Sequence, residues 1–505
     1  MNLITEENRK WWVLIALCMA SVLINLDTTI VNLAIPEIAR VMRASLNKMQ
    51  WVGNIFTFGA ALSFVLAGRL SDVIGSRKVF LSGMLVFLFA SIVCGAAPNI
   101  PILLIGRFLQ GFGFAFCLPI IVVITRHIFP EHKWGLVMGI VATIAGLSQA
   151  IGPTLGGVIL EFLSWRWVFF INVPVCLLSL WLLRVSYRKN DETRDEKIDY
   201  IGVGILGTGI LCLLTALNQI AVLGFTSFIF WGLILIGLCA LYGFYYFEQR
   251  QKHPLVDFDL FKLRNYLLVV LMRPLQMILW ATVLFLFPIY MINILGFNPI
   301  KSGVTLLTMT LIFGLSSPLM GKLSDRYGIK TMLISSNILS VIVFTLLLFT
   351  NANSLGWQFY TAMVLYGFVI GIILINTVRA AMSALPAEKA GAGTGIFYTV
   401  VSFGIGLGYA LSGAIITLVS HHHLQHALTK RSWNFGEIQH TWLMNAVNGT
   451  RPLHEVARHF PADQFHKVLP IIKHSFISGF HAVMAFNIVL AGITLLLAFM
   501  LREAE

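Results

Sequence analysis

Charged side chains are scarce in this sequence. Only 11% of its 505 residues are Asp, Glu, Lys or Arg, whereas 58% are hydrophobic, and the mean hydropathy is +0.84. Soluble domains carry roughly 25% charged residues, so the composition excludes a water-soluble fold. The six cysteines all lie inside apolar runs, without a disulfide framework or a zinc or redox spacing. No cleavage signal follows Arg9 and Lys10, and we therefore expect the first apolar run to be retained.

Signatures of catalysis are also missing. The sequence has no HExxH motif, no paired carboxylates inside an apolar run, no nucleophile elbow and no phosphate-binding loop. These absences argue against a membrane-embedded enzyme and leave no role for a cofactor or a bound metal ion. A channel is a second alternative. The internal repeat described below argues against it, because two repeated bundles with a site between them imply that the site is occluded during transport.

Long apolar runs make up most of the chain, and we count fourteen that can cross a bilayer, at about 20 residues each. With the N-terminus in the cytoplasm, 22 Lys and Arg lie inside, 11 outside and two within spans. Six of the outer 11 lie in one long segment, 421–474, and long outer segments count little in the positive-inside rule. The net charge of +13 therefore indicates membrane orientation, with both termini cytoplasmic, and not nucleic-acid binding.

Polar segments and a repeat predict how the chain is divided. We expect a six-helix bundle at 1–186, two linker helices with flanking cytoplasmic segments at 187–265, and a second six-helix bundle at 266–505 that includes a long outer loop at 421–474. GRLSDVIGSRKVF at 68–80 and GKLSDRYGIKTML at 321–333 share Gly, Leu, Ser, Asp and Gly in register. Repeated bundles with a site between them are a common transporter architecture.

Several motifs occur together in one order: LDTTIVNLAIPEI at 26–38, GRLSDVIGSRK at 68–78, LLIGRFLQGFG at 103–113, GLSQAIGPTLGG at 146–157, WRWVFFINVP at 165–174 and HPLVDFDLF at 253–261. In order and spacing they resemble the fourteen-helix drug/proton antiporters of the major facilitator superfamily, the EmrB/QacA type, over nearly the whole chain. The resemblance implies an all-α polytopic membrane protein with the major facilitator fold, two six-helix bundles plus two extra helices. It further implies a multi-pass protein of the bacterial inner membrane that exports small amphiphilic or hydrophobic compounds by alternating access, driven by the proton gradient.

Asp27 is the only carboxylate well inside a predicted span. With a helical rise of about 1.5 Å per residue, Asp27 lies roughly 8 Å below the outer surface and Arg107 roughly 9 Å below it. Burial disfavours a charged carboxylate and a neighbouring cation favours it, so moving the partner or admitting water could protonate Asp27. We predict that Asp27 and Arg107 couple transport to protons; the alternative is a permanent ion pair that joins two helices.

Two further groups of residues are predicted to control access. The repeated loops suggest a cytoplasmic gate with an Asp near a helix end and basic residues that hold the bundles together; its members are Gly68, Asp72, Arg77, Lys78, Asp325 and Arg326. The motif at 146–157 gives a helix with little side-chain bulk on one face, either a tight seal of the antiporter branch or ordinary membrane-helix packing. The residues concerned are Gly146, Gly152, Pro153 and Gly156.

Candidate substrate-cavity residues combine aromatic and polar side chains, and they are Asn32, Gln110, Arg273, Gln276, Trp280 and Tyr398. Arg273 either reaches lipid headgroups or faces the cavity, where it would attract an anionic or zwitterionic group. The second reading supports a rival function, a dedicated exporter of a metabolite such as a siderophore or organic anion. The predicted helix at 391–420 has no acidic residue, which makes doubly charged cations doubtful substrates by comparison with QacA-like pumps.

The expected partners are a small-molecule substrate, protons and membrane lipids. EmrB-like pumps join a periplasmic adaptor, and the segment 421–474 is the docking candidate if this chain works in such an assembly. That segment holds nine of the 13 histidines, beginning HHHLQH at 421–426. We interpret it as a solvated amphipathic loop that responds to external pH or contacts a partner, and we predict no metal site.

Overall fold

The computed structural model describes residues 5–6, 8–42, 46–187, 199–223, 227–251, 254–297, 299–351, 356–431, 433, 435–447 and 453–502, and these residues are helical apart from short connections. Thirteen helical spans in the described chain are long and apolar enough to cross a membrane. Helix α5 (Trp134–Phe162), with 29 residues and Glu161 as its only charged residue, makes a fourteenth. Helices are expected here because a lipid-embedded backbone must satisfy its own hydrogen bonds. The predicted all-α fold is confirmed.

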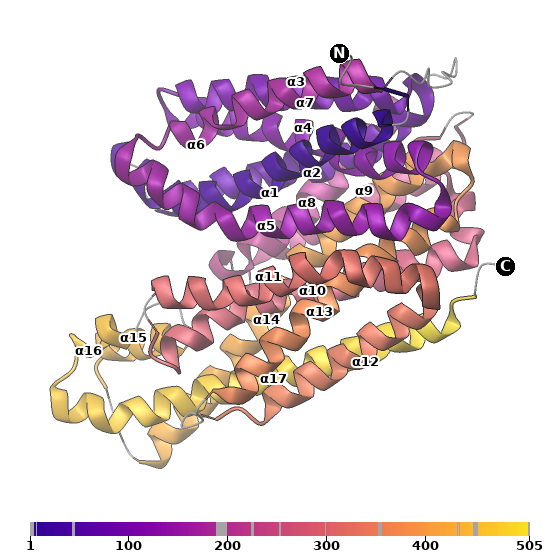
Figure 1. The fold of residues 1–505 in the computed structure, drawn as a ribbon. Helices are drawn as coiled ribbons and strands as arrows, with labels where there is room; N and C mark the ends of the chain where they lie inside the picture. Colours follow the sequence, from indigo (N-terminus) through magenta and orange to yellow (C-terminus); the bar gives the residue numbers. More distant parts are fainter. Residues whose placement is uncertain are drawn as a thin grey trace.

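The first half of the molecule contains the helices before residue 187. They are α1 (Arg9–Val41), α2 (Leu46–Ile74), α3 (Ser76–Ala96), α4 (Ile100–Ile128), α5, and the short α6 (Trp167–Phe170) continuing into α7 (Asn172–Ser186). The second half has the same order of long helices: α10 (Arg264–Asn293), α11 (Pro299–Tyr327), α12 (Ile329–Leu348), α13 (Trp357–Ser383), α14 (Ala390–Lys430) and α17 (Ala462–Met500). The two halves occupy separate layers in Figure 1.

The sequence repeat corresponds to equivalent turns in the two halves. Gly75 ends the turn between α2 and α3 with φ 95°, and Gly328 does the same between α11 and α12 with φ 84°. Only glycine adopts such angles without strain. The shared glycine is therefore needed for a sharp reversal after the second helix of each half.

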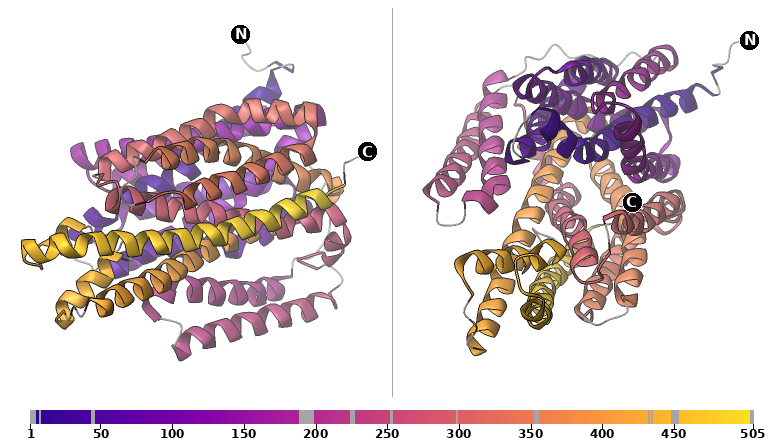
Figure 2. Two further views of the ribbon diagram at one scale, coloured as in Figure 1. Left: turned by 90° about the horizontal axis from the view of Figure 1, so that it is seen from below. Right: turned by 90° about the vertical axis from the view of Figure 1, so that its left-hand side faces the viewer.

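Two helices stand outside the halves. Helices α8 (Tyr200–Leu223) and α9 (Phe228–Glu248) pack against each other, and α8 also contacts α2 and α14. They form a pair at the edge of the molecule in Figure 2. Large apolar side chains of α9 such as Phe228 and Tyr242 are 91% and 73% exposed, which suits a lipid-facing position. The polar segment expected between α7 and α8, at 187–197, lies almost wholly outside the described residues.

The expectation of an outer loop at 421–474 is wrong. Helix α14 continues to Lys430 and α17 already starts at Ala462, and between them lie α15 (Glu437–Val447) and α16 (Leu453–Ala457). Leu424, Leu443, Val456, Phe460 and Ile472 form a hydrophobic core of this region. The prediction failed because mixed His and Leu positions look polar on average, whereas the apolar residues share one helical face. We call this region the outer cap.

The halves contact each other mainly on the side that carries both chain ends, which we call the inner side. There α2 packs on α14 and α5 packs on α11. Towards the opposite side the two layers diverge (Figure 1). This arrangement closes the inner side and separates the halves on the outer side.

Candidate functional site

A cavity of about 640 Å³ lies between the two halves. Helices α1, α2, α4 and α5 of the first half and α10, α11, α13 and α14 of the second half contribute to its wall. Its aromatic side chains include Phe56, Phe64, Phe114, Trp280, Tyr398 and Tyr409. Sites for small molecules typically measure roughly 300–1,000 Å³ and combine apolar walls with a few polar groups. The cavity therefore has the size and lining of a site for an amphiphilic molecule.

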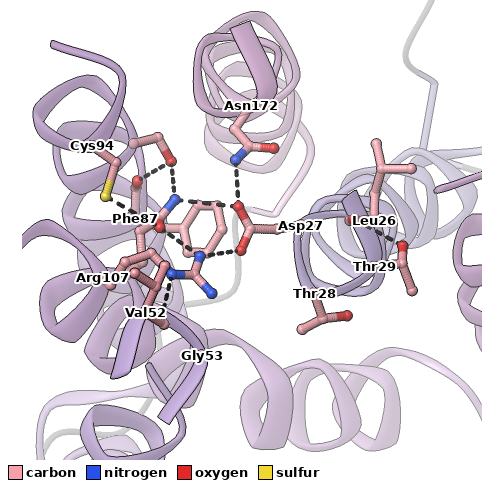
Figure 3. A network of polar contacts seen from close by, with 12 residues as sticks. Leu26, Asp27, Thr28, Thr29, Val52, Gly53, Phe87, Cys94, Arg107 and Asn172 are labelled. Atoms are coloured by element: carbon pink, nitrogen blue, oxygen red, sulfur yellow. Dashed lines mark hydrogen bonds and ion pairs between the residues drawn. The ribbon is translucent and has the colours of Figure 1, made fainter. Parts of the chain in front are cut away.

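Asp27 and Arg107 form an ion pair inside the first half (Figure 3). Nη1 of Arg107 lies 2.5 Å from Oδ2 of Asp27, and the two side chains are 2% and 0% exposed. Arg107 lines the cavity, as does Thr28 next to Asp27. The acid is thus shielded from lipid and lies directly behind the wall of the cavity.

The second carboxylate oxygen of Asp27 accepts two amide donors. Nδ2 of Asn172 lies 3.0 Å and Nε2 of Gln110 3.4 Å from Oδ1. Gln110 also donates to Oγ of Ser91 at 2.8 Å. Helices α1, α4 and α7 therefore meet at one carboxylate, with α3 attached through Ser91.

Arg107 has other acceptors besides Asp27. Its Nε donates to the carbonyl of Val52 at 3.1 Å and its Nη1 to Oε1 of Gln110 at 2.8 Å, while its guanidinium lies 4.5 Å from the centre of the Phe56 ring. A cation over an aromatic ring gains about 0.5–2 kcal/mol. Arg107 would consequently keep these partners if Asp27 became neutral. Such additional partners are not needed by an ion pair that only joins two helices.

Asn172 was not predicted as a site residue. It is fully buried, and its Oδ1 has no hydrogen-bond partner among the described residues. A rotation of the amide would let this oxygen accept a hydrogen from a protonated Asp27. Its signal in the sequence was the motif WRWVFFINVP at 165–174, which contains it, but periodicity alone could not show which face of α7 points to α1.

The predicted cavity residues divide into two groups. Asn32, Arg273, Trp280 and Tyr398 lie on the cavity wall, whereas Gln110 belongs to the buried network around Asp27. Gln276 is also buried, with Oε1 3.1 Å from the Thr377 hydroxyl. Of the two orientations considered for Arg273, the structure has the one directed to the cavity.

The two repeated aspartates lie at the contacts between the halves. Asp72 on α2 accepts hydrogen bonds from the backbone N–H groups of Gly391 and Ala392 at the start of α14, both at 2.8 Å. Asp325 on α11 accepts from the backbone of Gly135 and Leu136 at the start of α5. Each acid therefore interacts with the positive end of a helix dipole in the other half.

Arginines add to these inner contacts. Arg379, which we had not predicted, pairs with Asp325 at 2.7 Å, and Arg126 donates to the carbonyl of Leu385 in the other half at 2.9 Å.

The basic residues predicted for the gate lie beside the turns between α2 and α3 and between α11 and α12. Arg77 donates to the carbonyl of Arg184 at 2.9 Å, within its own half. Lys78 and Arg326 are exposed. That Arg77 or Lys78 holds the bundles together on the inner side stays a prediction.

Glycines permit the closest backbone contacts between the halves. A Cβ atom on Gly68 would lie 2.2 Å from the carbonyl oxygen of Gly391. On α5, Gly146 meets Phe313 of α11, whereas a Cβ atom on Gly152 would lie 1.9 Å from Oγ1 of Thr29 and one on Gly156 would lie 3.2 Å from Leu33 of α1. Helix α5 thus packs against both halves; the side chain of Pro153 lies outside the described residues.

The fold and the site together define a membrane transporter with two bundles around a central cavity. The family model of the Major Facilitator Superfamily matches residues 17–409, and the chain belongs to this family.

Named relatives and a solved structure agree with this assignment. The chain is 29% identical over 411 residues to the tetracenomycin C resistance and export protein of Streptomyces glaucescens, covering 81% of this chain and 76% of that protein. It is 28% identical over 423 residues to multidrug resistance protein 3 of Bacillus subtilis, covering 83% and 82%. The crystal structure of the human organic anion transporter MFSD10 superposes with a TM-score of 0.61 at 12% identity, over 98% of this chain and 100% of that one. At this identity the last match shows the fold alone.

Proposed function

We propose that this protein is a proton-coupled antiporter of the fourteen-helix drug/proton type that exports small amphiphilic or hydrophobic compounds by alternating access. Distant relatives named for drug resistance and antibiotic export support export as the direction. The apolar, aromatic cavity supports amphiphilic substrates. In this proposal the inner side is cytoplasmic and the membrane is the inner membrane of a bacterium.

The observation that carries the proposal is the position of Asp27. A buried carboxylate without function would be expensive to keep at bilayer depth. Here the acid lies behind Arg107 on the cavity wall, and both members of the pair have other partners, Asn172 for the acid and Val52 for the base. Such a network can accommodate a charged and a neutral Asp27, which a proton carrier requires.

The proposed cycle links Asp27 to the inner gate. With the inner side closed, a proton from the outside neutralises Asp27, weakens its link to Arg107 and favours release of the substrate. Opening of the inner side requires the contacts of Asp72 with α14 and of Asp325 with α5 to break. Exchange results only if proton and substrate prefer different states of the bundles.

A counterflow screen tests the function directly. Purified protein in liposomes would be offered neutral, cationic and anionic fluorescent amphiphiles, with and without a pH gradient. We expect uptake into acid-loaded vesicles that nigericin abolishes, and proton release from the vesicles that depends on the substrate. Uptake that stays equal when the pH gradient is removed would refute proton coupling. The protein would then be a transporter that moves its substrate without protons.

The outer cap supports an additional partner. It joins α15 and α16 to the ends of α14 and α17 through a hydrophobic core that includes Leu443 and Phe460, and we propose this region as the docking surface for a periplasmic adaptor. Co-purification from native membranes, with and without residues 433–460, tests this. Recovery of the same partners without the cap would exclude it as the docking region.

A further inference from the structure

Arg273 is buried without a counter-ion. It lies on α10, is 2% exposed and lines the central cavity. Its Nε and Nη1 have no hydrogen-bond partner, and no described residue forms an ion pair or a hydrogen bond with this guanidinium. The other arginine of the cavity wall, Arg107, is paired with Asp27.

The surroundings of Arg273 compensate only part of its burial. Its guanidinium carbon lies 5.4 Å from the centre of the Phe397 ring, a contact that provides about 0.5–2 kcal/mol. An uncompensated charge at this depth costs several kcal/mol, and an arginine cannot shed its proton. Arg273 lies nine residues after Arg264, which is the first residue of α10, and therefore about 14 Å from the inner end of this helix. Its side chain lines the cavity and does not reach towards lipid.

The charge of the cavity wall has one sign. No Asp or Glu is among the described residues that line the cavity, and Arg273 is the one lining residue among them whose charge is not paired. Trp280, about two helical turns further along α10, and Tyr398 on α14 place aromatic surface on the same wall. An anionic group beside an aromatic body matches this combination, because a guanidinium binds carboxylate, sulfonate and phosphate oxygens in a planar fork.

We propose that Arg273 is the anion-binding residue of the cavity and that the exported compounds are amphiphiles with an aromatic or apolar body and one acidic group. The inference rests on the proposed export function and narrows its substrate class. It predicts that an anion supplies the partner that the chain itself does not provide. Neutral molecules of the same shape would bind through the apolar wall alone and more weakly.

Two probes that differ by one acidic group test the proposal. Anilinonaphthalene sulfonate and N-phenyl-1-naphthylamine share the same aromatic body, and only the first carries a sulfonate. Their affinities would be measured by equilibrium dialysis against the full chain in nanodiscs, with empty nanodiscs subtracted and no pH gradient. We expect the wild type to prefer the sulfonate, Arg273→Gln to lose at least about tenfold in sulfonate affinity, as for one charge-assisted contact, and the neutral probe to change less than about twofold.

Variants separate recognition from packing. Arg273→Lys keeps the charge and should retain part of the sulfonate preference. Arg458→Gln removes the same charge from an exposed position in the outer cap and should change neither affinity. A wild type without preference for the sulfonate, an unchanged sulfonate affinity in Arg273→Gln, or an equal loss for both probes would overturn the proposal. Because no gradient is applied, failure of proton coupling leaves this result unaffected.

Discussion

Replacing Asp27 by Asn removes the proton-binding group with almost no change in shape. The carboxylate accepts from Arg107 at 2.5 Å, Asn172 at 3.0 Å and Gln110 at 3.4 Å. A hydrogen bond to a charged group contributes about 1.5–3 kcal/mol, and a buried charge left alone costs about 3–5 kcal/mol. Arg107 keeps the Val52 carbonyl and Gln110 as acceptors. We therefore expect a loss of about 2 kcal/mol in folding stability and normal membrane insertion.

The effect on transport should be much larger than the effect on stability. An amide takes up no proton in the physiological range, so substrate-induced proton release from liposomes should fall to the level of protein-free vesicles. Exchange of labelled for unlabelled substrate needs no net proton movement, and it should continue. The two assays, run on the same preparation, separate lost coupling from a lost fold.

The control is Asp463→Asn, which makes the same chemical change at an exposed position at the start of α17. It should leave both assays unchanged. Proton release by Asp27→Asn at the wild-type rate would remove Asp27 from the mechanism. Loss of both proton release and exchange would favour the alternative, an ion pair that only holds α1 against α4.

Three further substitutions probe the network and the gate. Asn172→Leu removes both the donor for the charged acid and the acceptor for the neutral one, and should reduce proton-driven export about tenfold while exchange persists. Asp72→Asn should weaken the interaction of residue 72 with the N-terminus of α14 by about 1 kcal/mol. Distances between spin labels across the inner side should therefore lengthen. Gly391→Ala places a Cβ 2.4 Å from both Oδ1 of Asp72 and the carbonyl oxygen of Gly68, and should open the same distances further; unchanged distances would contradict the gate.

The ion pair could be predicted from the sequence because it depends only on the number of carboxylates inside predicted spans and on the depth of each charged residue along its helix. The chain has one carboxylate inside a predicted span, and the helical rise put Arg107 at the same depth. The repeat likewise predicted equivalent positions for Asp72 and Asp325. These features depend on distance along a helix or on similarity between two segments, both of which a single sequence contains.

The sequence did not show which face of a helix points to its neighbour, nor which distant segments of the chain pack together. Asn172 contacts Asp27 and Arg379 contacts Asp325 because of the faces that α7 and α13 present. Nearly uniform apolar helices give little periodic signal for such a face. The orientation of Arg273 stayed undecided for the same reason. The outer cap was missed since its core forms only when the ends of α14 and α17 pack against α15 and α16.

The positions of Asp27 and Arg273 limit how proton and substrate can be coupled. Asp27 follows Arg9 by 18 residues, about 27 Å along α1, whereas Arg273 lies about 14 Å along α10, so the two differ in depth by roughly 13 Å. The distance between the two charges is at least this difference in depth, so across a water-filled cavity they interact by at most about 0.3 kcal/mol. Moreover, protonating Asp27 removes a negative charge, which would slightly strengthen the binding of an anion and not release it. For an anionic substrate, the direct electrostatic interaction between Asp27 and the bound anion is therefore too small, and its change on protonation has the wrong sign to release the substrate. Exchange requires that the proton shift the equilibrium between the two arrangements of the bundles, at the contacts made by Asp72 and Asp325.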